Sequence, residues 1–494
     1  MSPRKPEPTA LHKRLILAAT VLGSSMAFID GSVVNVALPV MQRNLGMGAG
    51  AAQWVVNAYM LMLGALVLVG GAAGDIWGRR KVFLFGMALF AAASAACGLA
   101  PGKEVLLAGR ALQGLGAALL TPSSLALLNA NFSDQERNRA MGAWAGFGAL
   151  TGALGPVLGG WLADTVGWRS IFYLNLPIAA AAFALTLYAI PESRDDEETG
   201  GLDYLGAGLA AAGLGALTWG LTAAPDRGFT DAWVLAALIG GGVLLAAFLV
   251  AEAREKHPMM PLGLFKSPAF SGVNLLTLLL YFALSGAFFF LPFDLIRVQR
   301  MSPTMAGAAM VPMPLIFGLL AGPGGRFADR FGARWPLSLG PLVCGVGFAM
   351  LALPVRGANY FTGYLPALVV LSLGMSVTVG PLTATVMGAV ERKHAGLASG
   401  VNNAVARVAG LLAVASLGVV LFEAYRLVGG GGTAARGAFN ATMAGAMHSA
   451  ASLDSFHHAM RLVMLVCGAA AALGGVASFL TLKDARPAKP QSAA

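Results

Sequence analysis

The chain has 494 residues, of which 57% are hydrophobic and 11% are charged, and its mean hydropathy is +0.71. Soluble globular domains carry about 25% charged residues, so this composition excludes an ordinary soluble enzyme and indicates an integral membrane protein. The net charge of +10 could suit a nucleic-acid-binding protein. Basic residues that face the cytoplasm explain it better in a membrane chain, and we expect no nucleic-acid partner.

Fourteen apolar runs are long enough to cross a bilayer as helices. They cover residues 14–38, 51–72, 82–100, 104–128, 141–163, 169–190, 204–223, 232–252, 270–292, 304–325, 336–354, 361–387, 397–422 and 459–482. We therefore expect an all-α integral membrane protein with fourteen transmembrane helices. The last outer loop, 423–458, contains a glycine run and is expected to be flexible.

An even number of spans places both termini on one side of the membrane. Lys and Arg outside the spans concentrate on that side, which predicts cytoplasmic termini. The basic start of the chain runs into the first span without a small-residue cleavage site, so we expect no cleaved signal peptide. The expected location is a cell membrane, the inner membrane of a bacterium, with the lipid bilayer as the surrounding partner.

The first span contains Asp30, and an ionisable residue inside a span is a functional hypothesis by default. Asp30 lies roughly 12 Å below the outer end of its span, and Arg110 of the fourth span lies roughly 9 Å below the same side. We expect these two residues to form a proton or cation site. The alternative is a static ion pair that holds the first and fourth spans together.

The turn between the second and third spans combines glycines, one acid and three bases. Asp75 precedes Arg79 by one helical turn, so it can cap a helix N-terminus or accept from Arg79. We expect a gating motif that holds the cytoplasmic side shut; the alternative is a plain topology signal. Its residues are Gly74, Asp75, Gly78, Arg79, Arg80 and Lys81, and the turn after the tenth span echoes it with Asp329 and Arg330.

The turn motif follows the second span of the first six-span unit, and its repeat follows the second span of the last six. This predicts a duplicated chain with a site at the membrane midplane, as in secondary transporters. The expected parts are a cytoplasmic tail (1–13), an N-terminal six-helix half (14–190), linkers with an inserted seventh and eighth span (191–269), a C-terminal six-helix half (270–482) and a second cytoplasmic tail (483–494).

The fifth span carries small residues on one face, mostly at four-residue spacing, with a proline among them. Such a groove lets another helix approach and slide, and the proline permits a bend; the alternative is close packing without gating. The residues are Gly152, Gly155, Pro156, Gly159 and Gly160.

Several aromatic residues in the spans could line a substrate cavity, although core or lipid-facing packing is the alternative for each: Phe28, Trp54, Tyr59, Trp144, Phe147 and Tyr281. Because acids inside the spans are scarce, neutral or monocationic lipophiles fit better than multivalent cations. Anions stay open because Arg110 and Arg407 lie in spans. Arg407 has no acid at matching depth and no assigned role.

No nucleophile, metal-ligating or phosphate-binding constellation is found in the sequence. We expect no enzyme activity, no catalytic residue, no metal and no cofactor.

These motifs resemble the major facilitator superfamily, in its fourteen-span drug:proton antiporter branch (EmrB/QacA-like). The resemblance rests on the loop motif above, on Asp30–Pro39, on Arg110 with Gln113, Gly114 and Gly116, on Gly152–Gly160, and on Trp168–Pro177. It implies a proton-coupled exporter of lipophilic small molecules, as in multidrug efflux, working by alternating access with substrate and protons as partners. Uptake or exchange of a specific metabolite by the same fold is the alternative. Whether accessory envelope export proteins take part is left open.

Overall fold

The computed structural model describes residues 10–194, 202–255, 258–391, 395–429, 434–446 and 449–482. Every regular element in these ranges is helical. In chain order they are α1 (Ala10–Asn44), α2 (Ala49–Trp77), α3 (Arg79–Leu99), α4 (Lys103–Asn131), α5 (Asp134–Thr165), α6 (Ser170–Tyr173), α7 (Asn175–Ala189), α8 (Tyr204–Arg227), α9 (Ala232–Arg254), the 3-10 helix η1 (Leu262–Lys266), α10 (Pro268–Phe293), the π-helix η2 (Asp294–Val298), α11 (Pro303–Met310), α12 (Pro312–Phe331), α13 (Arg334–Leu351), α14 (Tyr360–Gly388), α15 (Ala395–Val428), α16 (Ala434–Ala444) and α17 (Ala450–Thr481).

The prediction of fourteen spans is confirmed, because fourteen helical segments of the described chain are long and apolar enough to cross a membrane. The tenth span is divided into α11 and α12 at Val311, next to Pro312, whose nitrogen cannot donate to the helical ladder. The last span begins at Ala450 and not near residue 459. Polar residues interrupt its apolar run, but the helix continues because several of them find partners within the protein.

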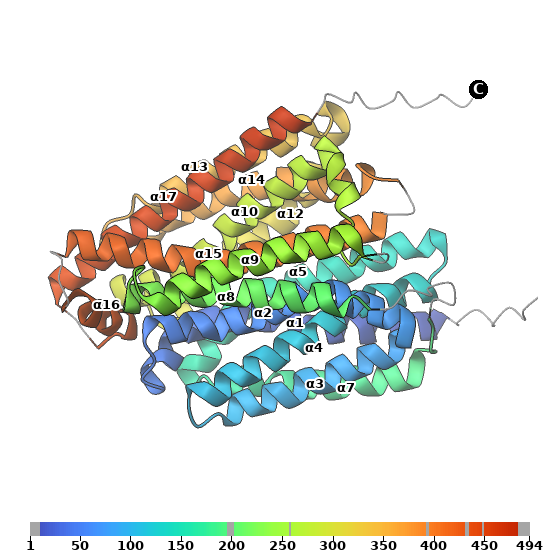
Figure 1. Cartoon of the computed structure of the whole chain (residues 1–494), viewed down its shortest axis with the longest axis horizontal. Coiled ribbons are helices and arrows are strands. Elements are labelled where there is room, and N and C mark those ends of the chain that lie inside the picture. Colours follow the sequence, from blue (N-terminus) through green and yellow to red (C-terminus); the bar gives the residue numbers. More distant parts are fainter. Residues whose placement is uncertain are drawn as a thin grey trace, which may run out of the picture.

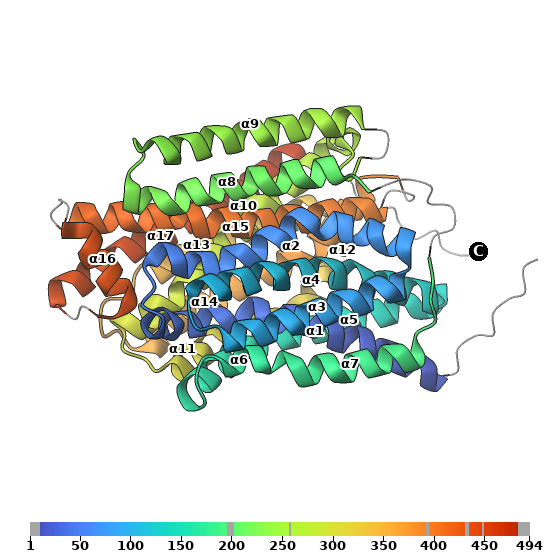
Figure 2. The same ribbon diagram turned by 60° about the horizontal axis from the view of Figure 1, so that its bottom comes forward.

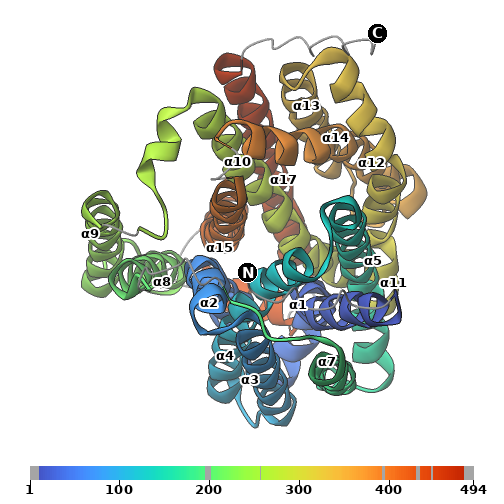
Figure 3. The same cartoon turned by 90° about the vertical axis from the view of Figure 1, so that its right-hand side faces the viewer.

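The helices form two packed sets with a hairpin beside them (Figures 1 and 2). In the N-terminal set, α1–α7, the main contacts are α2 with α4, α3 with α4 and α1 with α5. In the C-terminal set, α10–α17, they are α13 with α14, α13 with α17 and α10 with α17. The hairpin α8–α9 stands to one side, where α8 rests on α2 and α15 and α9 packs on α8 (Figure 3).

The helix α1 begins and α17 ends at the same end of the bundle, which we call the termini end; the opposite one is the far end (Figure 2). At the far end, hydrogen bonds join the two sets. The Thr304 amide donates to Asp164 Oδ2 at 2.8 Å, and Arg297 Nη2 donates to the Pro39 carbonyl at 2.7 Å. The far end is therefore closed.

The expected flexible loop 423–458 is replaced over most of its length by helix. Helix α15 continues to Val428, and α16 packs under α15 and α17 at the far end. Asn440 of α16 accepts from the Ala49 amide of α2 at 3.0 Å. This helix therefore connects the C-terminal set with the start of α2.

Candidate functional site

Asp30 of α1 and Arg110 of α4 form a buried ion pair, which their similar predicted depths allow. Arg110 Nη1 donates to Asp30 Oδ2, and Arg110 Nε donates to the Val55 carbonyl at 2.8 Å. The side chains of Asp30 and Arg110 are 0% and 1% exposed. Removing one partner of such a pair leaves a buried charge uncompensated, which costs about 3–5 kcal/mol.

A hydrogen-bond network surrounds this pair. Gln113 accepts from Arg110 Nη1 at 2.9 Å and donates to Asp30 Oδ1 at 3.2 Å and to Ser94 Oγ at 2.7 Å. Asn175 also donates to Ser94 Oγ, at 3.1 Å. Gln113 and Asn175 lie in segments that the sequence matched to motifs without a role, whereas Ser94 was not predicted. The spacing of Gln113, one turn after Arg110, is the signal that could have found it.

Beside this network, the central cavity has a volume of about 300 Å³ and is lined by helices of both sets. Phe28 and Met60 of the N-terminal set lie on its wall. The C-terminal set supplies the other lining residues: Tyr281, Ser285, Leu382, Thr383, Val386, Ser399, Asn402, Asn403, Ala406, Arg407 and Gly410. A cavity of this size, with apolar walls and a few polar groups, is typical of small-molecule sites.

Of the six aromatic residues proposed for the cavity, Phe28 and Tyr281 line it. Trp144 packs edge-on against Phe28 and donates to Ser24 Oγ at 2.9 Å, so it supports the wall from behind. Tyr59 belongs to the ion-pair network, since the Arg110 guanidinium lies 4.5 Å from its ring centroid. Phe147 is 51% exposed, and Trp54 is half-buried outside the lining.

The turn between α2 and α3 is built around Gly78, whose φ of 107° suits glycine. Asp75 accepts from Arg79 at 2.8 Å and caps no helix. The first amides of α3 are bound instead by Glu192, which accepts from the backbone of Arg80 at 3.0 Å and of Lys81 at 3.2 Å. Glu192 therefore ties the segment after α7 to this turn, a role that the sequence analysis missed.

The rest of this motif is placed as follows. Gly74 is buried, and its Cβ position lies 3.3 Å from Ser123 Oγ of α4. In the echo on α12, Arg330 is exposed and lies over the Phe331 ring. The side chain of Asp329 lies outside the described part of the chain.

The glycine face of α5 contacts both sets near the far end. A Cβ on Gly155 or Gly159 would collide with Ser32 or Val33 of α1, and one on Gly160 would lie 2.2 Å from the Pro303 carbonyl of α11. The Cβ position of Gly152 has nothing within 4 Å. The backbone of Pro156 also packs against α11, since a Cβ built on Gly307 would lie 2.1 Å from the Pro156 carbonyl oxygen.

Nearer the termini end the glycines of α5 and α12 face open space, whereas α2 and α15 stay in contact across the two sets. The Cβ positions of Gly142 and Gly146 on α5, and of Gly318 and Gly322 on α12, have nothing within 4 Å. The α5 groove is therefore tight where the bundle is closed and free where it is not.

A second buried carboxylate, Asp294, lies in the C-terminal set. His457 Nδ1 lies 2.9 Å from Asp294 Oδ1, and the Tyr364 hydroxyl donates to Asp294 Oδ2 at 2.6 Å. The other ring nitrogen of His457 lies 2.8 Å from the Pro354 carbonyl. Both ring nitrogens thus face acceptors, which a doubly protonated imidazole satisfies. His457 was not predicted, because it lies just before the apolar run 459–482 in the sequence.

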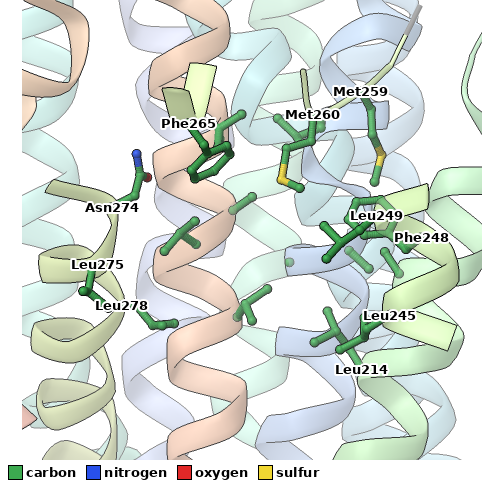
Figure 4. Close-up of a pocket in the computed structure, with 18 of the residues that line it drawn as sticks. Leu214, Leu245, Phe248, Leu249, Met259, Met260, Phe265, Asn274, Leu275 and Leu278 are labelled. Carbon is green, nitrogen blue, oxygen red and sulfur yellow. The ribbon is translucent and has the colours of Figure 1, made fainter. Parts of the chain in front are cut away.

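A lateral pocket of about 440 Å³ lies between the α8–α9 hairpin and helices α2, α10 and α15 (Figure 4). Leu249 and Leu275 line it and are 47% and 43% exposed, so it opens at the side of the bundle. Its polar side chains are satisfied within the wall: Ser271 donates to the Phe265 carbonyl at 2.6 Å, and Asn274 accepts from Asn402 at 3.1 Å. The pocket therefore suits an uncharged apolar group.

Residues 20–414 match the model of the Major Facilitator Superfamily. The chain is 35% identical to the Multidrug resistance protein Stp of Mycobacterium tuberculosis over 408 residues, which cover 82% of this chain and 75% of that protein. It is 34% identical to the Methylenomycin A resistance protein of Bacillus subtilis over 440 residues, with coverages of 89% and 92%. It is 32% identical to the Tetracenomycin C resistance and export protein of Streptomyces glaucescens over 406 residues, with coverages of 82% and 75%.

Solved structures share the fold at low sequence identity. A bacterial homologue of the human lysosomal transporter Spinster, in an inward-facing and occupied conformation, has a TM-score of 0.68 at 15% identity, covering 96% of this chain and 97% of that one. A D-xylose-proton symporter has a TM-score of 0.64 at 13% identity, with coverages of 97% and 98%. The fold prediction is confirmed.

Proposed function

Because the chain belongs to the Major Facilitator Superfamily, we propose that it is a proton-coupled antiporter that exports lipophilic small molecules by alternating access. The observation that carries this proposal is the buried Asp30–Arg110 pair beside the central cavity. When Asp30 binds a proton it loses its negative charge, and its ion pair with Arg110 breaks. Proton binding can therefore be coupled to a change in the contacts between helices.

The two ends of the bundle support alternating access. The far end is closed by contacts between the sets, whereas towards the termini end the glycines of α5 and α12 face open space. With both termini in the cytoplasm of a bacterial inner membrane, this is a cytoplasm-facing state. The intact ion pair is then the proton-free form of the site, as expected after a proton has been delivered inward.

The lateral pocket and the names of the relatives support a lipophilic substrate. The pocket would receive an apolar molecule from the lipid. Relatives are named for multidrug, methylenomycin A and tetracenomycin C resistance, and we extend export of such compounds to this chain as a proposal. Neither a cofactor nor an enzyme activity is part of it.

Transport in inside-out vesicles tests the proposal with a dye panel and a pH probe. Acidification of the lumen should drive uphill accumulation of a dye, and a protonophore should abolish it. Accumulation driven by the opposite proton gradient would favour uptake by the same fold. A reporter fused after Ala494 should be active in the cytoplasm, and activity outside it would rule out the topology.

A further inference from the structure

Arg407 of α15 lines the central cavity without a counter-charge. In the described residues, no hydrogen bond or ion pair to its guanidinium is found. The Cβ position of Gly64 lies 3.2 Å from Arg407 Cβ, so the α2 backbone packs against the base of the side chain. Arg407 is half-buried. A charge inside a membrane bundle is costly, and such residues normally pair with another group or face a cavity.

The neighbouring polar groups do not supply the missing partner. None of the described residues on the cavity wall is an acid. The side-chain nitrogens of Asn402 and Asn403 donate to Asn274, Thr277 and the Ser399 carbonyl. Their side-chain oxygens, which could accept from a guanidinium, make no hydrogen bond to Arg407 in the described part of the chain. The nearby carboxylate, Asp30, is already bound by Arg110. Among the described lining residues, the guanidinium is thus the one charge without a counter-charge.

We propose that Arg407 binds an acidic oxygen group of the substrate, so that the transported class is lipophilic molecules with one carboxylate. A guanidinium offers a planar fork that matches a carboxylate in a bidentate geometry. Apolar side chains on the same wall, Phe28, Met60, Leu382 and Val386, would hold the rest of the molecule. This proposal rests on the proposed function, whose substrate class it narrows from neutral, cationic or anionic lipophiles to anionic ones.

The test compares two probes that share an apolar ring system and differ in the charged group at the end of the chain. 4-(1-Pyrenyl)butyrate carries a carboxylate, and 4-(1-pyrenyl)butylamine carries an ammonium group on the same ring system. Equilibrium binding is measured on the full chain in phosphatidylcholine nanodiscs by energy transfer from tryptophan to pyrene, with the signal of empty nanodiscs subtracted. No proton gradient is present, so the result does not depend on transport.

We expect the wild-type chain to bind the butyrate probe about tenfold or more tightly than the amine. Arg407→Gln should abolish this preference, and Arg407→Lys should keep part of it because a point charge remains. Arg426→Gln is the matched control. It removes the same charge from the same helix, at an exposed position paired with Glu423, and should leave the preference unchanged.

Binding of neither probe, a preference for the amine, or an unchanged preference in Arg407→Gln would overturn the proposal. The wild-type comparison stands even if Arg407→Gln does not fold. Selective butyrate binding without proton-driven transport would support the role of Arg407 and contradict the proposed antiport, so the two failures are distinguishable.

Discussion

Among the described residues, each helix set buries one carboxylate, but with different partners. In the N-terminal set, Asp30 faces Arg110, whose guanidinium keeps its charge at every physiological pH. In the C-terminal set, Asp294 faces His457 and Tyr364, and an imidazole changes its charge near neutral pH. The first site joins α1 to α4 beside the central cavity, whereas the second joins η2, α14 and α17 near the far end.

The difference suggests a division of labour. Protonation of Asp30 would free a permanent cation in the middle of the bundle, which must then find new contacts. Protonation at the Asp294 cluster can be balanced by its own histidine, so little rearrangement is needed. We therefore expect the N-terminal site to couple and the C-terminal site to stabilise.

The largest expected effect is that of Asp30→Asn. A neutral amide cannot titrate, so proton-driven dye accumulation in vesicles should fall to background, while downhill exchange survives. Asp30→Glu should retain partial activity at a shifted pH optimum. Asp294→Asn is the matched variant in the other set and should keep most of the accumulation per folded molecule. Equal loss in both would remove the contrast between the sites.

Variants in the turn between α2 and α3 should have the second-largest effect on transport. Asp75→Asn or Arg79→Ala removes a partly exposed ion pair and should lower turnover about tenfold while expression stays nearly normal, because the pair stabilises one conformation more than the fold. Glu192→Gln should have a similar effect through α3. Arg330→Ala, in the echo on α12, is the comparison and should lower turnover less. Wild-type turnover in all three turn variants would reduce the turn to a topology signal.

His457→Leu should act on stability more than on transport. It leaves Asp294 buried without its nitrogen partner, a loss of about 3–5 kcal/mol. The half-life of the purified protein at elevated temperature should shorten, while transport per folded molecule stays within about twofold of wild type. A normal half-life together with lost proton coupling would instead assign the coupling role to this cluster.

Tyr364→Phe should give the smallest change. It removes the hydrogen bond that the hydroxyl donates to Asp294 and the one that it accepts from Gln299 at 2.7 Å, and it leaves His457 in place, so about 2 kcal/mol of stability is expected to be lost. The same half-life assay checks it against His457→Leu. A larger effect for Tyr364→Phe would mean that the hydroxyl, and not the imidazole, is the main partner of Asp294.

The fold could be predicted because bilayer thickness imposes a length on every apolar run. Asp30 and Arg110 could be paired because helical rise converts sequence position into depth. Depth along the membrane normal does not say in which direction around the helix a side chain points. The sequence therefore could not predict which aromatic residues line the cavity, which join the ion-pair network and which lie on the surface. Glu192 and His457 were missed for a related reason: each lies at the edge of an apolar run and acts on a segment distant in sequence.

Proton flux coupled to substrate flux tests the central claim most directly. Proteoliposomes with a pH-sensitive dye in the lumen would receive a gradient of a transported dye in the absence of a pH gradient. The account predicts that protons move against the direction of the dye in the wild type and that Asp30→Asn shows no proton movement. Dye flux without proton flux, proton flux in the same direction as the dye, or full coupling in Asp30→Asn would contradict it.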